Sequence, residues 1–187
     1  MNTAERLVSA AAELLDAGGE AAVTLRAVAA AVGVSHNAPY KHFTSRDALL
    51  AEVAVADFTA LTDNWAQIRT SPEKPAERLL SALDVLIRFS QDRPAHYHLL
   101  FASPEIAAQG GRLTDAANSA LGAFSDIVED CQAGAVLPAS PGNTLAVVLF
   151  AATHGLIAAA ASGRLRSESG IDTRSGMEFL IGLLHGR

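Results

Sequence analysis

Residues 24 to 49 read TLRAVAAAVGVSHNAPYKHFTSRDAL, and this stretch decides the fold. Thr24 is of a residue type preferred at a helix N-cap, and the apolar residues after it recur at helical spacing on one face. Gly33 stands where this helix must end, because glycine adopts the left-handed conformation that a sharp turn requires. The stretch therefore predicts a helix over 25–32, a tight turn and a second helix over 36–42. This is the layout of a helix-turn-helix, in which the second helix reads DNA.

The segments on either side extend this prediction. Upstream, the apolar positions predict an amphipathic helix over 3–17 that ends at the glycine pair of residues 18 and 19. Ser35 is placed to cap the second helix of the pair, and Ser45 is placed to cap a long helix over 46–69. Because that long helix runs from the DNA-reading end into the remainder of the chain, we expect it to transmit movement between the two.

The N-terminal run resembles the TetR family of bacterial transcriptional regulators. Many residue types at fixed spacing carry the resemblance: Thr24-Leu25-Arg26, Val28-Ala29, Gly33-Val34-Ser35, Tyr40, His42-Phe43, Ser45-Arg46 and Leu49-Leu50. The resemblance implies a three-helix DNA-binding head over residues 1–46 and a helical-bundle body for ligand binding and dimerisation over 47–187. A second resemblance, to the C-terminal domain of one TetR subgroup, is carried by residues 93–101 and by His154-Gly155, where Thr153 replaces the subgroup's usual Trp.

Two features depart from the family pattern. Pro39 stands where a large apolar residue is usual, in or just after the first turn of the second helix, where its missing N–H removes about one helical bond at most. The residues before Arg6 include no basic side chain, and residues 1–50 hold slightly more acidic than basic groups. We therefore expect either a modest electrostatic share in DNA affinity or an N-terminus that lacks its basic arm.

The second helix of the pair carries the candidate base contacts. Asn37 can present a donor and an acceptor to adenine, Lys41 can bind guanine or a phosphate, His36 can donate to either, and Ala38 can touch a thymine methyl. The resemblance adds DNA-backbone contacts. The full candidate set is Thr24, Arg26, Ser35, His36, Asn37, Ala38, Tyr40, Lys41, His42, Ser45 and Arg46. The alternative is a surface helix of an unrelated bundle.

Composition limits the class of protein. Half of the 187 residues are hydrophobic, the formal net charge is -6 and the pI is about 5.4, so we expect DNA contact on a small face only. Cys131 is the single cysteine, which excludes an internal disulfide and a multi-cysteine metal site. Residues 1–20 contain acidic groups and lack the apolar core of a signal peptide, which predicts a cytoplasmic protein.

The remainder of the chain favours helix throughout, which predicts an all-α fold, because Ala, Leu, Glu and Arg dominate and period-two runs are lacking. We expect helices near 75–91, 94–101, 112–132, 143–163 and 173–185, a short turn between Ser103 and Gly111, a loop over 134–142 and a mobile polar loop from Arg164 to Thr173. The most apolar stretch is Leu145 to Ala161. It is shorter than the ~20 strongly apolar residues of a transmembrane helix, so we expect a buried or dimer-forming helix.

Three other motifs have plain structural interpretations. On a helix, the rings of His96 and His98 point about 200° apart, so we expect one inward and one solvated ring rather than a metal site. His154 is a core histidine, a contact in the dimer seam or a polar group in a pocket. Cys131 lacks basic neighbours in sequence and follows two acidic residues, which raise a thiol pKa, so we expect an inert thiol.

A ligand pocket in the body follows from the resemblance alone. The candidate ligand-binding residues are Trp65, Phe89, His98, Phe101, Phe124 and His154. Few charges fall inside these helices, so a small, largely apolar or aromatic ligand is expected. The alternative is that these aromatic residues are core.

We expect a homodimeric regulator that binds a palindromic double-stranded DNA operator, with repression relieved by a small molecule. No enzyme activity, cofactor, metal or membrane attachment is expected. An activator or a ligand-independent regulator stays open within this class. A helical enzyme and a structural helical dimer are the alternatives outside it. The enzyme would need convergent polar groups in the body, and the structural dimer would show no salt-dependent DNA binding.

Overall fold

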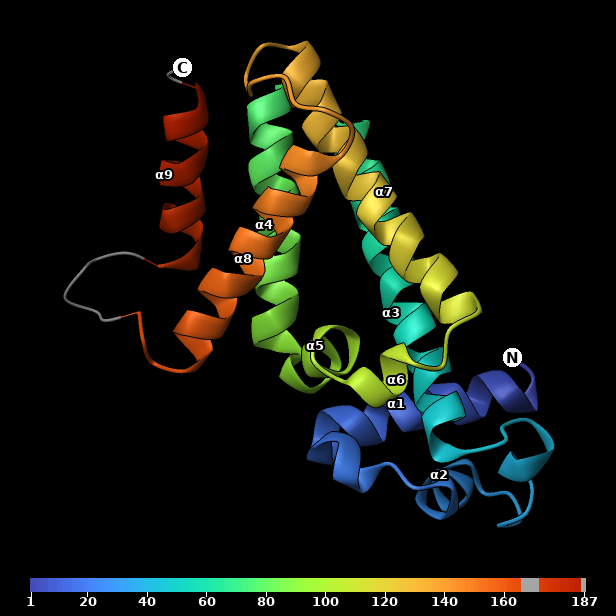
Figure 1. The fold of residues 1–187 in the computed structure, drawn as a ribbon. Helices are drawn as coiled ribbons and strands as arrows, with labels where there is room; N and C mark the ends of the chain where they lie inside the picture. The colour runs from blue at the N-terminus through green and yellow to red at the C-terminus, as the bar shows by residue number, and fades with distance from the viewer. Residues whose placement is uncertain (166–171, 186–187) are drawn as a thin grey trace. The chain divides into compact units, whose positions relative to one another are not determined.

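Helices make up all the regular structure of the computed structural model over its described residues, 1–165 and 172–185 (Figure 1). The elements are α1 (Thr3–Ala22), α2 (Leu25–Val32), η1 (Pro39–Lys41), α3 (Arg46–Arg69), α4 (Pro75–Asp92), α5 (Pro94–Phe101), α6 (Pro104–Ala107), α7 (Arg112–Ala133), α8 (Thr144–Ala161) and α9 (Thr173–His185). The all-α prediction is confirmed. The expected loop from Arg164 to Thr173 falls mostly on residues 166–171, which lie outside the described residues.

The chain forms two compact units. The first unit comprises residues 1–60 and 91–119, and therefore holds α1, α2, η1, α5, α6 and the first parts of α3 and α7. The second unit comprises residues 61–90 and 120–187 and holds most of α4, the remainders of α3 and α7, and α8 and α9. The boundary expected at residues 46 and 47 lies inside the first unit, where α3 begins.

Apolar side chains of α1 and α2 form the core of the first unit. Leu7 and Leu15 of α1 and Val28 of α2 are fully buried, together with Leu49 and Leu50 at the start of α3. Burying one such side chain contributes roughly 1.5–3 kcal/mol, so this core fixes α1 and α2 against the first turns of α3. The segment that the sequence predicts to read DNA, residues 36–42, is thus attached to a well-packed core.

The helix expected over 3–17 forms, and the backbone leaves helical geometry at the glycine pair, as expected. Gly18 (φ -149°, ψ 16°) and Gly19 (φ 67°, ψ -172°) leave helical geometry, but one more turn forms before the helix ends at Ala22. Val23 is fully buried, and its N–H donates to the Glu20 carbonyl at 3.2 Å. The glycine pair therefore ends the regular helix that the sequence predicts, and the short turn up to Ala22 lies beyond the kink.

Large aromatic and aliphatic side chains form the core of the second unit. Trp65 and Phe124 are each 1% exposed, and the Trp65 indole N–H donates to the Ala82 carbonyl at 2.9 Å. Helix α8 is long and apolar enough to cross a membrane by length and composition, with a mean hydropathy of 1.9. A single such helix is weak evidence, since core and interface helices have the same composition. Its Leu149 and Thr153 are buried within the unit.

Candidate nucleic-acid interface

The first helix of the predicted pair has the expected ends. The Thr24 hydroxyl accepts from the Ala27 N–H at 3.0 Å and caps α2. Gly33 (φ 74°, ψ 32°) is left-handed, and the following N–H of Val34 donates back to the Ala29 carbonyl at 3.0 Å. This bond across the end of the helix is the one that a glycine C-cap permits. The sequence prediction of a helix over 25–32 and a turn at Gly33 is confirmed.

The second helix of the pair is not an α-helix, and the prediction for 36–42 is wrong. Residues 36–38 form a turn, and Pro39–Lys41 form a single 3-10 turn. In an α-helix the Ser35 carbonyl would accept from residue 39, but Pro39 has no N–H. That carbonyl accepts instead from the Ala38 N–H at 2.9 Å. The expected cap by Ser35 is wrong as well, since the N-cap of η1 is Ala38 and no side chain caps it.

The polar side chains of this segment point to solvent. Exposed residues are Thr24, Arg26, Ser35, His36, Asn37, Tyr40, Lys41, His42 and Ser45, whereas Ala38 is half-buried. Tyr40 is 63% exposed, while its neighbour Pro39 and the nearby Phe43 are buried and anchor the turn. Arg26, His36 and Tyr40 together line a surface hollow of about 380 Å³. The structure thus places a cationic, an imidazole and a phenolic group around one hollow.

Arg46 has a different position from the other candidates. Its Nε donates to the Val23 carbonyl at 2.7 Å, and its guanidinium also bonds the Glu20 carbonyl and pairs with Asp47 at 3.3 Å. The side chain therefore ties the start of α3 to the end of α1. The Ser45 hydroxyl caps α3 by accepting from the Ala48 N–H at 3.0 Å, as expected.

The structure also joins four residues that the sequence did not bring together. Arg93 and His96 of α5 contact Asp16 of α1 and Asp57 of α3, all within the first unit. Arg93 lowers the pKa of Asp16 by hydrogen bonding, and the same bond raises the pKa of Arg93. We call these residues the α1–α3–α5 quartet. His96 is fully buried and the side chain of His98 is 63% exposed, which confirms the expected inward and solvated rings.

Comparison with protein families and solved structures now identifies the chain. Residues 7–53 match the model described as bacterial regulatory proteins of the tetR family, and residues 79–184 match the tetracyclin repressor-like C-terminal domain. The chain belongs to the TetR family. It is therefore a DNA-binding transcriptional regulator and not an enzyme. Comparison with curated protein sequences gave no match.

Solved structures share the fold of this TetR regulator at low sequence identity. A Rhodococcus protein of unknown function has 23% identity and a TM-score of 0.79, covering 99% of this chain and 94% of its own. FadR of Bacillus halodurans, a fatty acid degradation regulator, has 12% identity and a TM-score of 0.72, with 98% and 95% covered. Reduced NemR of E. coli has 16% identity and a TM-score of 0.70, with 98% and 97% covered.

The six residues expected to bind ligand fall into separate places. Trp65, Phe124 and His154 meet around Phe150 in the second unit, with ring centroids 4.5–6.3 Å apart. Burial lowers the pKa of His154 to about 4, so this imidazole is neutral. Phe89 is half-buried on α4 in the same unit. Because Trp65 and Phe124 are fully buried, this group has the packing of a core.

The other two candidates lie in the first unit. Phe101 packs against Phe58 with ring centroids 5.6 Å apart, and His98 pairs with Glu20 at 3.3 Å on the surface. A cavity of about 170 Å³ opens beside Phe58. Its lining comes from α3, α5, α6 and the start of α7: Ala54, Phe58, Leu99, Leu100, Ile106, Ala107, Leu113, Thr114, Ala117 and Asn118. None of the six expected residues lines it.

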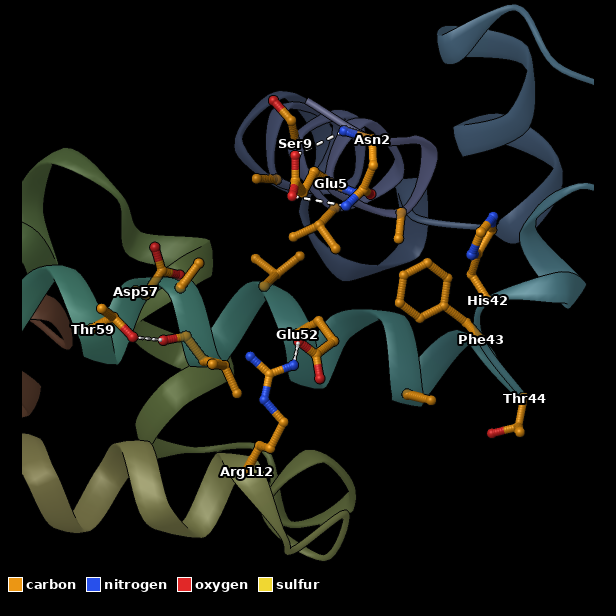
Figure 2. Close-up of a pocket in the computed structure, with 17 residues that line it drawn as sticks. Asn2, Glu5, Ser9, His42, Phe43, Thr44, Glu52, Asp57, Thr59 and Arg112 are labelled. Atoms are coloured by element: carbon orange, nitrogen blue, oxygen red, sulfur yellow. Dashed lines mark hydrogen bonds and ion pairs between the residues drawn. The ribbon is translucent and has the colours of Figure 1, made fainter.

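A wider hollow of about 940 Å³ lies between α1 and α3 (Figure 2). Glu52 of α3 and Arg112 at the start of α7 face one another there and pair at 2.7 Å. Asn2 and Glu5 also line the hollow, and their side chains already hydrogen-bond in the capping box of α1. The charged groups named here therefore satisfy one another, and they present no preformed charge to a ligand.

Cys131 is buried, and burial raises its thiol pKa to about 11. The expected inert thiol is supported. Cys131 has no basic neighbour in sequence, but the fold brings Arg78 of α4 near it, and this charge acts to lower the pKa. The dominant cause is loss of solvent, and the acidic Asp130 contributes less.

Proposed function

We propose that this TetR-family regulator is a cytoplasmic, ligand-responsive repressor that binds a palindromic operator as a homodimer. The observation that carries the DNA-binding part is the exposed group of Arg26, His36, Tyr40 and Lys41 on a turn held by buried neighbours. Such side chains supply donors to phosphates and base edges, while the packed base fixes their positions.

The DNA contacts divide by position. Asn37, Lys41 and His36 are exposed on the turn and are proposed to reach base edges, with Ala38 beside them. Thr24 and Ser45 cap helix N-termini, where backbone N–H groups favour a phosphate, and Tyr40, His42, Arg26 and Ser35 are proposed as further backbone contacts. Arg46, whose guanidinium already bonds two carbonyls, is proposed to orient α3.

The homodimer is supported by an apolar surface on α8 and α9. Val147, Val148, Phe179 and Leu183 are each 44–69% exposed, and they are four of the most exposed large apolar side chains among the described residues. Helices α8 and α9 contact each other within the second unit. Two copies of this helix pair would bury the exposed residues in a four-helix seam with two-fold symmetry.

The ligand is proposed to be small and largely apolar. The cavity beside Phe58 supports this, because mainly aliphatic and aromatic side chains line it and only Thr114 and Asn118 are polar. The Trp65, Phe124 and His154 group is the second candidate and would have to open to admit a ligand. In either case the ligand must bind the released state of the regulator better than the DNA-bound state.

Selection of bound duplexes from a random DNA pool tests the proposal. The purified protein is expected to enrich a palindromic consensus. Tyr40→Ala and Lys41→Ala should lose it, while the matched control Lys74→Ala, which removes a charge from an exposed lysine elsewhere, should retain it. Enrichment that survives both turn variants would refute the assigned DNA face, and a monomer bound to a single half-site would refute the dimer.

A further inference from the structure

The α1–α3–α5 quartet brings together four ionisable groups, none of which is among the proposed DNA contacts. Asp16, Asp57 and His96 come from three helices of the first unit, Arg93 directly precedes α5, and α1 packs on α2, the first helix of the helix-turn-helix. His96 is completely buried, and Asp57 is 7% exposed. A titratable ring enclosed by two carboxylates and a guanidinium couples its protonation to the positions of all three helices.

Arg93 holds both carboxylates. Its Nε and Nη2 donate to Asp16 Oδ1 and Oδ2 at 3.2 and 2.8 Å, and its Nη1 donates to Asp57 Oδ1 at 3.2 Å. His96 Nδ1 lies 2.6 Å from Asp57 Oδ2. These are the charged groups that face the ring from α1, α3 and α5. The neighbouring pair of His98 and Glu20 lies on the surface.

The second nitrogen of His96 has two sets of partners. Nε2 lies 2.8 Å from Arg93 Nη2, and it also lies 3.2 Å from the Ala12 carbonyl and 3.3 Å from Asp16 Oδ1. A guanidinium has donors only, so the contact with Arg93 requires Nε2 to accept. The neutral ring therefore donates from Nδ1 to Asp57 and accepts from Arg93, and it donates nothing to α1.

Protonation reverses the role of Nε2. An Nε2–H cannot receive the Arg93 donor, whereas the Ala12 carbonyl and the Asp16 carboxylate of α1 are acceptors within reach. The formal charge of the quartet rises from -1 to zero, and the ring then bridges α3 and α1. Protonation thus replaces the hydrogen bond from Arg93 to Nε2 with a hydrogen bond from Nε2–H to α1.

We propose that His96 is a proton-dependent positioning residue for α1, and that its protonation strengthens operator binding. Fixing α1 before DNA binds reduces the ordering cost that binding must offset. A coupling of ordinary size corresponds to roughly a fivefold change in affinity or more. The affinity effect rests on the DNA binding of the family, whereas the exchange of partners at His96 does not.

Nitrogen-15 NMR of the imidazoles in the free, full-length protein tests the exchange directly. In base we expect His96 as the Nδ1–H tautomer, and on acidification we expect an Nε2–H signal to appear together with shifts of the backbone signals of Ala12 and Asp16. An Nε2–H tautomer in base, an Nε2 that never carries a proton while the protein stays folded, or backbone signals that do not follow the His96 ring overturns the proposal whatever DNA is bound.

Operator affinity measured against pH tests the consequence. The duplex is the one selected from the random pool, and His36 and His42 are the same in every protein compared, so the readout is the difference between the profiles of the variants. Relative to the parent protein, His96→Gln should remove a roughly fivefold tightening on acidification, whereas the matched control His98→Gln on the same helix should retain it. Equal profiles with and without His96 overturn the proposal.

A third variant covers the case in which His96→Gln does not fold. Asp57→Asn keeps the shape of the side chain but removes the anion beside Nδ1, so the protonated ring is disfavoured. Operator binding should then tighten at a lower pH than in the parent protein, and the His96 ring signals in the NMR spectrum should change at a lower pH as well. An unchanged profile for Asp57→Asn overturns the proposal independently of His96→Gln.

Discussion

The two units of this regulator contain similar sets of charged residues in unlike surroundings. In the first unit, Arg93 pairs with Asp57, whose side chain is 9% exposed, beside the buried His96. In the second unit, Arg69 pairs with Asp126 and Asp130, whose side chains are 46% and 30% exposed. Each arginine pairs with two carboxylates, and the two sites differ in the burial of the groups around the arginine.

Burial changes what a lost partner leaves behind. A charge left alone in the interior keeps its desolvation cost, whereas a surface charge left alone returns to water. Removing a member of the quartet is therefore expected to lower the free energy of unfolding strongly. Removing a carboxylate that pairs with Arg69 is expected to lower it little. The predictions below test this contrast, beginning with the largest effect.

Asp57→Ala should lower the free energy of unfolding by about 3–5 kcal/mol, because it leaves Arg93 and His96 without their shared carboxylate. Circular dichroism during denaturant unfolding measures this loss. The single tryptophan, Trp65, reports separately on the second unit. If the units unfold independently, the Trp65 fluorescence transition should stay in place. A loss below about 1 kcal/mol would mean that the buried ion pairs of the first unit stabilise it no more than exposed ion pairs do.

His154 should make the second unit sensitive to acid. Its folded pKa of about 4 is below the ordinary 6.5, so the unfolded chain binds the proton first as the pH falls. Stability is fully present above about pH 6.5 and is lost as the pH falls toward 4, by at most about 3 kcal/mol. His154→Phe should reduce this loss. Denaturant unfolding at about pH 7 and 4.5 measures it, and equal losses in both proteins would contradict the assignment.

Asp126→Ala, the counterpart of Asp57→Ala in the second unit, should cost no more than about 1 kcal/mol. Its carboxylate is nearly half exposed, and Arg69 keeps its two hydrogen bonds to Asp130. Trp65 fluorescence during denaturant unfolding is the direct measurement. A cost equal to that of Asp57→Ala would mean that burial does not decide the strength of these networks.

Lys41→Ala should have the smallest effect on stability, within about 0.5 kcal/mol, because the side chain is exposed and packs on nothing that the core needs. Thermal unfolding of the variant beside the parent protein measures this. The same change is expected to abolish enrichment of the operator. Together these results would separate the residues that bind from those that hold the first unit together, and a large loss of stability would contradict that separation.

Much of the fold could be predicted from local chemistry. The bounds of α2 and α3 follow from Thr24, Gly33 and Ser45, because caps and left-handed glycines act within a few residues. The error at 36–42 was also local. Pro39 lies four residues after Ser35, where an α-helix needs an N–H, so this signal was present in the sequence and its effect was underestimated.

The quartet and the cavity beside Phe58 could not be predicted in this way. Asp16, Asp57 and His96 lie far apart in the chain, and only the packing of α1, α3 and α5 brings them within hydrogen-bonding distance. The same holds for the pocket candidates. Residue type alone does not say which apolar side chains fill a core, as Trp65 and Phe124 do, and which line a cavity, as leucine, isoleucine and alanine do beside Phe58.

The sequence by itself determined the helical class, the family, both ends of α2 and the start of α3, because each depends on residue type at short spacing. The tertiary structure decided which ionisable groups are buried together, which histidine is enclosed and where the chain leaves a cavity. The physical reason is that burial and electrostatic interaction depend on distance in space, and residues distant in sequence approach one another only when the helices pack.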